Sequence, residues 1–469
     1  MFIFRQYLRL QCIIVMMIEA VAFCAAPFLA AHLLARTFRD VLLILSAGWW
    51  PAALLFTGVM MTGLLSMGLY CARQRARFDG IVIRICIASV GTFVALCLVF
   101  SFAAPHPMSR SLLALTTLLA FTASVITRAA MEKIGDDDRF KRRVLVYGSG
   151  QHAMSISRLR RRSDQRAFVI VGFVPPAGVP PPGSAPSDLS DRLLPADEPL
   201  LSLCRRLNVD EIVLAMDDRR REFPVQELLE CRMSGYEVIE LSTFFERETG
   251  KVRVDVLNPS WMIFGDGFNR SSARRLTERG FDFLASVILA ALTCPIVVLI
   301  ALAIKIEDGW RAPIFYFQTR VGFENKLFKL IKFRSMRVDA EMDGTPRWAA
   351  PSDPRITRVG MVLRKLRLDE LPQIFNVLVG DMRFVGPRPE RPHFVDSLNT
   401  QIPYYRERHF VKPGITGWAQ LCYSYGASLN DATEKLQYDL YYIKNQSLMF
   451  DFIILLATLE VVFLGKGAR

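Results

Sequence analysis

Residues 281–304 read FDFLASVILAALTCPIVVLIALAI, a run of 24 residues that is long enough to span a bilayer as a helix. Pro295 stands near the middle of this run, where it removes a backbone hydrogen bond and kinks or breaks a helix. Basic residues flank the run: Arg274, Arg275 and Arg279 before it, and Lys305 after it. Two structures fit these features equally well. One is a kinked spanning helix, and the other is a re-entrant helix–break–helix whose flanks both stay in the cytoplasm.

Four more apolar runs precede it, at residues 11–35, 41–70, 81–103 and 111–130, each near or above the length that spans a bilayer. Short segments connect them, and a basic cluster at 139–143 follows the fourth. By the positive-inside rule, this cluster places both the N-terminus and everything after residue 130 in the cytoplasm. We therefore predict four transmembrane helices within residues 1–135.

The composition of the whole chain agrees with a membrane protein. Of its 469 residues 52% are hydrophobic, which excludes an ordinary soluble enzyme and a disordered protein. The net charge of +13 suits either nucleic acid or a membrane surface with anionic lipids. Because the basic residues gather at the ends of apolar runs and around a pair of carboxylates, we interpret the charge as serving a membrane and anionic substrates, and we exclude nucleic acid.

Residues 140–265 have the pattern of an α/β domain. Four strands are predicted, at 144–147, 168–174, 209–216 and 236–241. Gly148-Ser-Gly150 follows the first of them and precedes a helix, as in a Rossmann-like unit. However, Ala153 takes the third position of the glycine fingerprint, and no acidic residue ends the second strand. A structural turn is therefore favoured over a nucleotide site, and we favour a structural or dimerisation role for this domain.

Three clusters after residue 305 carry charged groups suited to chemistry: Lys329–Met336, Leu363–Gln373 and Gly380–Glu390. In the second cluster, Asp369 and Glu370 are adjacent and Pro372 follows, a pattern that usually opens a helix with acids in its first turn. The basic residues Arg364, Lys365 and Arg367 precede the pair. Such cations keep a carboxylate ionised and attract an anionic, phosphorylated substrate.

From about residue 274 to 469 the sequence resembles the bacterial sugar transferase family, the polyprenyl-phosphate phosphoglycosyltransferases. The matching stretches follow one another in order: Lys332–Met336, Asp353–Thr357, Leu368–Pro372, Asn376-Val377, Gly386–Glu390, His409, Lys412–Gln420 and Leu436–Tyr442. The segment around Tyr425–Ser428 resembles the members associated with exopolysaccharide and exosortase loci. The four spans and the Rossmann-like unit resemble the N-terminal extension of the family's large members.

The resemblance implies a two-step reaction. A carboxylate attacks the sugar-side phosphorus of a UDP-sugar, UMP leaves, and polyprenyl phosphate then takes the phosphosugar from the enzyme. By the motif match, the catalytic residues are Asp369 as nucleophile, Glu370, Lys332 and Arg364, and the substrate-binding residues are Arg334, Arg388, Pro389 and Glu390. Mg²⁺ is the expected cofactor, with Asp369 and Glu370 as its ligands. The partners are the UDP-sugar, polyprenyl (undecaprenyl) phosphate and the bilayer, and a homodimer is a further expectation.

The expected fold is thus a membrane protein with a four-helix transmembrane bundle, a Rossmann-like α/β domain and an α-rich monotopic catalytic domain at 274–469 with a re-entrant helix at 281–304. The expected location is the bacterial inner membrane, with the catalytic domain on the cytoplasmic face. The C-terminal stretch 447–464 contains Asp451 and Glu460, which are costly in a bilayer core, so an in-plane amphipathic helix is predicted there.

Two alternatives belong to other classes of protein. A membrane-bound nucleotide-sugar dehydratase would combine similar spans with a Rossmann unit, but it needs Tyr-x-x-x-Lys, and none of the 12 tyrosines has lysine four residues later. A non-catalytic scaffold of a polysaccharide assembly complex remains the second alternative, although the intact Asp369, Glu370 and Lys332 argue against it. Departures from the family pattern include Cys294 and Arg383, each where serine is usual. The identity of the sugar stays open.

Overall fold

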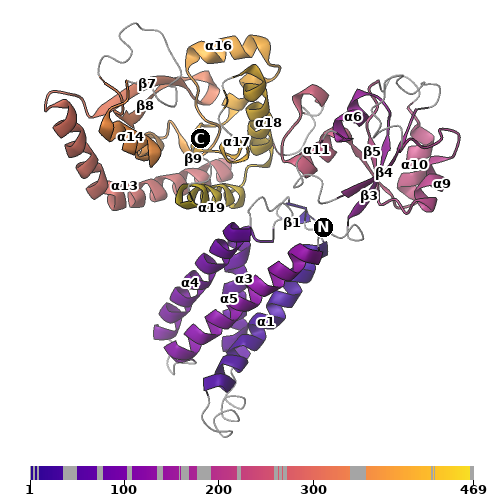
Figure 1. The fold of residues 1–469 in the computed structure, drawn as a ribbon, viewed down its shortest axis with the longest axis horizontal. Coiled ribbons are helices and arrows are strands. Elements are labelled where there is room, and N and C mark those ends of the chain that lie inside the picture. The colour runs from indigo at the N-terminus through magenta and orange to yellow at the C-terminus, as the bar shows by residue number, and fades with distance from the viewer. Residues whose placement is uncertain are drawn as a thin grey trace. The chain divides into compact units, whose positions relative to one another are not determined.

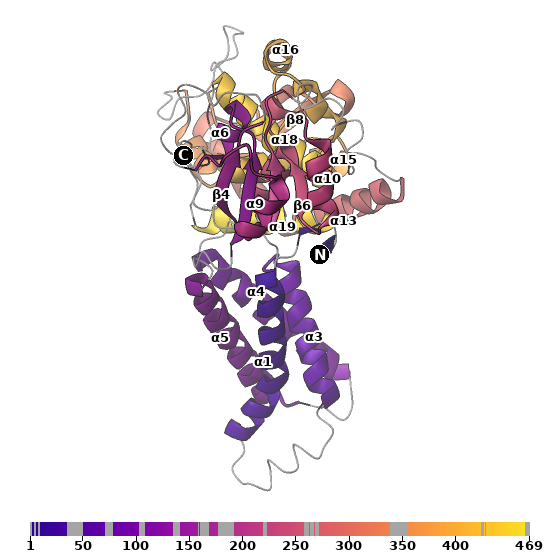
Figure 2. The same cartoon turned by 90° about the vertical axis from the view of Figure 1, so that its right-hand side faces the viewer.

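The computed structural model describes residues 2–3, 6–7, 10–34, 50–70, 78–102, 108–134, 141–157, 159, 168–176, 192–218, 223–257, 262, 267, 272–337, 355–423, 426 and 428–464. The chain divides into two compact units, Met1–Thr249 and Gly250–Arg469. The first contains a bundle of apolar helices and a separate α/β domain, which Figures 1 and 2 show from two sides. The second contains the three charged clusters.

Four apolar helices form the bundle: α1 (Leu10–Leu34), α3 (Trp50–Ser66), α4 (Phe78–Phe102) and α5 (Arg110–Ile134). A short hairpin of β1 (Phe2–Ile3) and β2 (Gln6–Tyr7) precedes them. Helix α1 packs against α3 and α5, and α4 packs against the same two helices, so the four form a closed bundle (Figure 1). Segments of α1, α4 and α5 are long and apolar enough to cross a membrane, whereas α3 has 17 residues. Residues 41–49 of the predicted second run lie outside the described part of the chain.

One ion pair lies buried inside this apolar bundle. Glu19 on α1 accepts hydrogen bonds from Arg128 Nε at 3.1 Å and from Ser124 Oγ at 2.6 Å, both on α5. The Glu19 side chain has no exposed surface. A charge among apolar helices is costly unless it is paired. This contact therefore fixes how α1 and α5 face each other.

The α/β domain confirms the four predicted strands as one parallel sheet. They are β3 (Arg142–Tyr147), β4 (Phe168–Val174), β5 (Glu211–Leu214) and β6 (Glu237–Glu240), in the order β4-β3-β5-β6. Val146 is aligned with Phe173 on one side and with Val213 on the other, so β3 is central. The helices of this domain are α6 (Gln151–Ser157), α9 (Leu200–Arg206), α10 (Val225–Met233) and α11 (Leu241–Thr249).

The turn after β3 is closed by a side chain of the same domain. The Asp217 carboxylate accepts hydrogen bonds from Gln151 N and His152 N, each at 2.8 Å, at the start of α6. A Cβ at Gly150 would lie 2.1 Å from Asp217 Oδ2, so only glycine permits this approach. In dinucleotide-binding sheets, the corresponding N–H groups meet the phosphate. Asp217 here fills that place, which supports a structural turn.

The first residues of the second unit pack against residues that lie much later in the chain. Val252, Val254 and Leu257, around the short 3₁₀ helix η2 (Val254–Val256), belong to its apolar core together with residues from Val321 to Ile454. Val252 N donates to Gln437 O at 2.9 Å. The compact unit therefore includes residues from Gly250 onward, and a catalytic domain at 274–469 stays a prediction.

Helix α13 (Ser272–Asp308) contains the whole apolar run 281–304, with Pro295 inside it. The helix bends along its course, as Figure 1 shows. Residues 274–308 are long and apolar enough to span a membrane, and only 11% of their most apolar window is buried in the protein. These features suit contact with lipid, and a re-entrant course remains a prediction.

The rest of the unit consists of elements shorter than α13 that follow it in the chain. Strands β7 (Phe315–Val321) and β8 (Leu327–Phe333) form an antiparallel hairpin that turns through the 3₁₀ helix η3 (Phe323–Asn325). Then follow α14 (Arg358–Lys365), the 3₁₀ helix η4 (Leu368–Glu370) and α15 (Gln373–Val379). Strand β9 (Arg383–Val385) pairs in parallel with β10 (Gly414–Thr416). The remaining elements are α16 (Pro392–Gln401), η5 (Tyr405–Phe410), α17 (Trp418–Cys422), α18 (Leu429–Asn445) and α19 (Leu448–Leu464).

Arg383 anchors α19 to α13. Its guanidinium lies 2.8 Å from Asp282 and 3.0 Å from Glu278, both on α13, and 3.0 Å from Asp451 on α19. All four side chains are buried. Asp451 is thus a buried partner of Arg383. This ion pair explains the presence of an acid in the apolar helix α19, and an amphipathic surface is not needed to explain it. Arg383, which departs from the family pattern, has a structural role.

Candidate active site

The adjacent carboxylates Asp369 and Glu370 lie in the 3₁₀ helix η4, between α14 and α15. Arg367, just before η4, has a φ of 56°, a left-handed conformation that turns the chain sharply after α14. Leu368 and Leu371 pack beside Phe333 and Leu363 in a small apolar core. The expectation that the pair opens an α-helix is wrong, because Pro372 caps α15 and the helix begins at Gln373.

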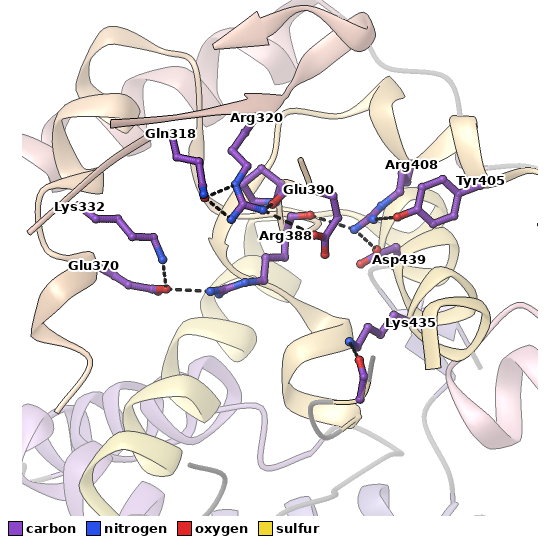
Figure 3. A network of polar contacts seen from close by, with 12 residues as sticks. Gln318, Arg320, Lys332, Glu370, Arg388, Glu390, Tyr405, Arg408, Lys435 and Asp439 are labelled. Atoms are coloured by element: carbon purple, nitrogen blue, oxygen red, sulfur yellow. Dashed lines mark hydrogen bonds and ion pairs between the residues drawn. The ribbon is translucent and has the colours of Figure 1, made fainter. Parts of the chain in front are cut away.

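Glu370 is held by two cations from distant parts of the chain. Lys332 Nζ on β8 lies 2.9 Å from Glu370 Oε1, and Arg388 Nη2 lies 2.8 Å from the same oxygen. Figure 3 shows Glu370 between these two side chains. Burial alone would raise the pKa of Glu370, but Arg388 and Lys332 outweigh it and hold the pKa well below its usual range. Glu370 therefore stays ionised and fixed.

Asp369 has a contrasting environment. No described residue donates a hydrogen bond to its carboxylate. Burial raises the pKa of Asp369 above its ordinary value, and the charge of Glu370 adds to that rise. Lys332, Arg364 and Arg388 oppose it. Two adjacent carboxylates whose pKa values are pushed apart suit different roles, one as a fixed anion and one as a reacting group.

The cations around the pair differ in how closely they are bound. Lys332 is half-buried, and burial lowers the pKa of its ammonium group, against the attraction of Glu370. Arg364, on the last turn of α14, acts on Asp369 through its charge and forms no ion pair with a described residue. These two residues and Arg388 are brought together with Asp369 and Glu370, as the sequence motifs suggest.

Arg334, just beyond the end of β8, forms its described ion pair with Asp308. Its Nη2 is 2.6 Å from Asp308 Oδ2, at the end of α13, and its side chain is 6% exposed. Its backbone N donates to Ile314 O at 2.9 Å. The contact with Asp308 ties Arg334 to α13, and substrate binding by Arg334 stays a prediction.

Pro389 and Glu390 continue the segment that carries Arg388. Arg320 on β7 donates to Pro389 O at 2.9 Å and lies 3.6 Å from the Glu390 carboxylate. On the other side, Arg408 Nη2 donates to Arg388 O at 3.0 Å (Figure 3). The segment is therefore pinned between β7 and η5, which fixes the direction of the Arg388 guanidinium.

Four further residues support this site, and the sequence alone assigns no role to them: Arg408, Tyr405, Asp439 and Asn376. Arg408 lies 2.9 Å from Asp439 on α18 and donates to the Tyr405 hydroxyl at 2.6 Å, a network drawn in Figure 3. Asn376 on α15 accepts from Ile331 N at 3.0 Å and donates to Lys329 O at 2.8 Å. Asn376 and Asp439 fall within stretches that match the family, and this match is the feature of the sequence that points to them. Arg408 precedes the motif residue His409.

The donor set of the site bears on the expected Mg²⁺. Mg²⁺ is commonly held by one or two carboxylates together with substrate phosphates. Asp369 and Glu370 provide two adjacent carboxylates, and Asp369 has no hydrogen-bond donor among the described residues. Among the residues that the structure describes, no group of three or more His, Cys, Asp or Glu side chains could hold a metal ion. The pair therefore fits an ion that takes its other ligands from a substrate.

Comparisons with known proteins place this geometry in context. The family model described as bacterial sugar transferase matches residues 273–465, which include every residue of the site. The UDP-N-acetylgalactosamine-undecaprenyl-phosphate N-acetylgalactosaminephosphotransferase of Aeromonas hydrophila is 42% identical over 242 residues, covering 52% of this chain and 56% of the relative.

Two other relatives match a longer part of the chain. The undecaprenyl-phosphate glucose phosphotransferase of Komagataeibacter xylinus is 32% identical over 337 residues, covering 70% of this chain and 60% of the relative. The UDP-glucose:undecaprenyl-phosphate glucose-1-phosphate transferase of Escherichia coli (strain K12) is 32% identical over 333 residues, covering 70% and 69%. The chain thus spans less than two thirds of the first two relatives and slightly more of the third.

Proposed function

Because the chain belongs to the bacterial sugar transferase family, we propose that it transfers a sugar 1-phosphate from a UDP-sugar to polyprenyl phosphate in a membrane. The product would be a polyprenyl diphosphosugar, and UMP would be released. The observation that carries the proposal is the contrast between the two carboxylates: Glu370 is bound by Lys332 and Arg388, whereas Asp369 has no hydrogen-bond donor among the described residues.

The first step uses Asp369 as a nucleophile. A carboxylate oxygen of Asp369 bonds to the sugar-side phosphorus, the bond from that phosphorus to the bridging oxygen breaks, and UMP leaves with the electron pair. A phosphosugar is then bound to Asp369 as an acyl phosphate. Covalent catalysis of this kind needs an ionised, positioned carboxylate. Burial of Asp369 supports the proposal because a desolvated carboxylate is a stronger nucleophile than a hydrated one.

The second step regenerates the enzyme. A phosphate oxygen of the polyprenyl phosphate bonds to the same phosphorus, and the Asp369 carboxylate leaves. Lys332, Arg364 and Arg388 act on Asp369 through their charges, and they would offset the negative charge that accumulates in both steps. Asp369 and Glu370 would hold Mg²⁺ together with diphosphate oxygens, and the ion would supply further neutralisation of that charge.

The lipid substrate requires a site at a membrane surface. Helix α13 exposes most of its apolar run, and the neighbouring α14 and α15 expose apolar side chains, among them Met361, Val362, Phe375 and Val379. A re-entrant course of α13, with both ends in the cytoplasm, would bring η4 to the interface where the lipid phosphate lies. We place the enzyme in the bacterial inner membrane with this unit on the cytoplasmic face, where it would start the assembly of an exopolysaccharide or another glycan.

A panel of nucleotide sugars tests the proposal directly. The purified full chain, in nanodiscs with undecaprenyl phosphate and Mg²⁺, is offered UDP-sugars one at a time, beginning with UDP-N-acetylgalactosamine and UDP-glucose, because the relatives' names contain these sugars. We expect lipid-dependent release of UMP with at least one sugar, and no release by Asp369→Asn. If no UDP-sugar yields UMP, the chain is not this enzyme, and a scaffold role gains support.

A further inference from the structure

Helix α13 contacts both ends of the chain segment that carries the two carboxylates. At one end, Arg279 Nη1 donates to Val377 O and Arg279 Nη2 donates to Leu378 O, each at 2.6 Å. These carbonyls belong to the last turn of α15, where the helix has no partners of its own for them. Arg279 thereby fixes the end of α15 to the start of α13.

At the other end of the segment, the first N–H groups of α14 donate to a carboxylate of α13. Glu307 Oε1 accepts from Arg358 N at 2.7 Å, and Glu307 Oε2 accepts from Val359 N at 2.9 Å. The first N–H groups of a helix are otherwise unsatisfied and carry partial positive charge. Thr357, the N-cap residue, serves only Gly360 N, at 2.9 Å. Glu307 therefore supplies a bidentate cap to α14 from a residue about 50 positions away.

The neighbouring residue Asp308 holds the strand that carries Lys332. Asp308 Oδ2 accepts from Arg334 Nη2 at 2.6 Å, just beyond the end of β8. Apolar contacts join the same three elements: Ile300 and Ile304 of α13 pack with Phe333 of β8 and Leu363 of α14. The last turn of α13 thus fixes both α14 and β8, and the bend of α13 (Figure 1) allows its two ends to reach one compact body.

We propose that Arg279, Glu307 and Asp308 are positioning residues, which fix the positions of Asp369, Glu370 and Lys332 relative to the apolar helix α13. The proposal rests on the proposed function and extends it. Through these contacts, the membrane helix and the reacting carboxylate form one rigid frame. A displacement of about 1 Å in an active site can cost about 100-fold in rate. Loss of one contact should therefore lower kcat while substrate binding persists.

Variants of Glu307 test this inference by graded loss of its two acceptor oxygens. Glu307→Gln keeps one acceptor, and Glu307→Ala removes both. The matched control is Glu324→Gln, since Glu324 is an exposed carboxylate in the β7–β8 turn that pairs only with the exposed Lys326 among the described residues. The full chain in nanodiscs is assayed for UMP release, with kcat and KM for the UDP-sugar, and for its unfolding temperature.

We expect kcat to fall about 5-fold in Glu307→Gln and about 30-fold in Glu307→Ala, with KM changed less than about 3-fold and the control within about 2-fold of the parent. Arg279→Ala, at the opposite end of the segment, should lower kcat in the same way. A parental kcat per folded molecule in Glu307→Ala and Arg279→Ala would overturn the inference, as would losses that only follow the loss of folded protein. If the parent itself releases no UMP, the proposed function fails instead.

Discussion

Lys332 Nζ lies 2.9 Å from Glu370 Oε1, and this contact joins strand β8 to the 3₁₀ helix η4 across the candidate active site. Arg388 completes it at 2.8 Å from the same oxygen. The two adjacent carboxylates therefore have different roles. Glu370 neutralises and orients two cations, and Asp369 remains available to react.

Glu370→Gln should lower kcat for UMP release by about 100-fold or more, because the cations lose the anion that holds them beside the reacting carboxylate. The protein should remain folded, since glutamine has nearly the shape of glutamate. Steady-state UMP release and the unfolding temperature in nanodiscs measure the two properties. A variant with parental kcat would show that Glu370 has no part in the reaction.

The acid limb of the pH profile should come from Asp369. Burial raises the pKa of Asp369, so protonation of this nucleophile removes activity as the pH falls through a value above that of an ordinary aspartate. Glu370, whose pKa is held well below its usual range, stays charged throughout that limb. Profiles of kcat/KM against pH for the parent and for Glu370→Gln provide the test.

In Glu370→Gln the acid limb should move to lower pH. The substitution removes the negative charge that helps to raise the pKa of Asp369, and it frees Lys332 to stabilise the Asp369 anion. An acid limb that stays in place, or moves upward, would mean that a group other than Asp369 titrates in it.

Arg383→Met should destabilise the second unit by about 3–5 kcal/mol, because it leaves Glu278, Asp282 and Asp451 buried without their shared cation. The unfolding temperature should fall clearly below that of the parent. Lys326→Met, which removes a cation with 78% of its side chain exposed, is the control and should change little. Equal stability of the two variants would contradict a structural role for Arg383.

Asp217→Ala should loosen the turn before α6 without affecting transfer. The loss of its two hydrogen bonds to Gln151 N and His152 N costs about 1 kcal/mol, as for other helix caps. UMP release should stay within about 2-fold of the parent. A gain in binding of NAD or another dinucleotide by this variant, or a large loss of activity, would argue against a purely structural turn.

Much of the fold follows from patterns that lie close together in the sequence. Runs of β-branched and aromatic residues predict the four parallel strands, and long apolar runs predict the bundle helices and α13, since burial and lipid contact both select for such residues. The structure brings Lys332 and Arg388 to Glu370, and the charges of both cations act on Asp369, whereas the catalytic roles of these residues stay predictions.

The remaining features depend on contacts that no local pattern encodes. Arg334 is two residues beyond Lys332, just past the end of β8, and its ion pair with Asp308 joins it to a residue 26 positions earlier in the chain. The Asp-Glu pair resembles a helix start, but the left-handed Arg367 and the cap at Pro372 place it in a separate 3₁₀ turn. Which carboxylate is tied to cations is decided by residues 38 and 18 positions away from Glu370.

The covalent intermediate tests the central claim most directly. The full chain is incubated with a UDP-sugar that supports UMP release, without polyprenyl phosphate, then quenched in acid, digested and analysed by mass spectrometry. We predict that the peptide containing Asp369 gains the mass of one phosphosugar, that adding polyprenyl phosphate removes it, and that Asp369→Asn shows neither adduct nor UMP release. UMP release by Asp369→Asn at the parental rate, or an adduct on another residue, would contradict the account.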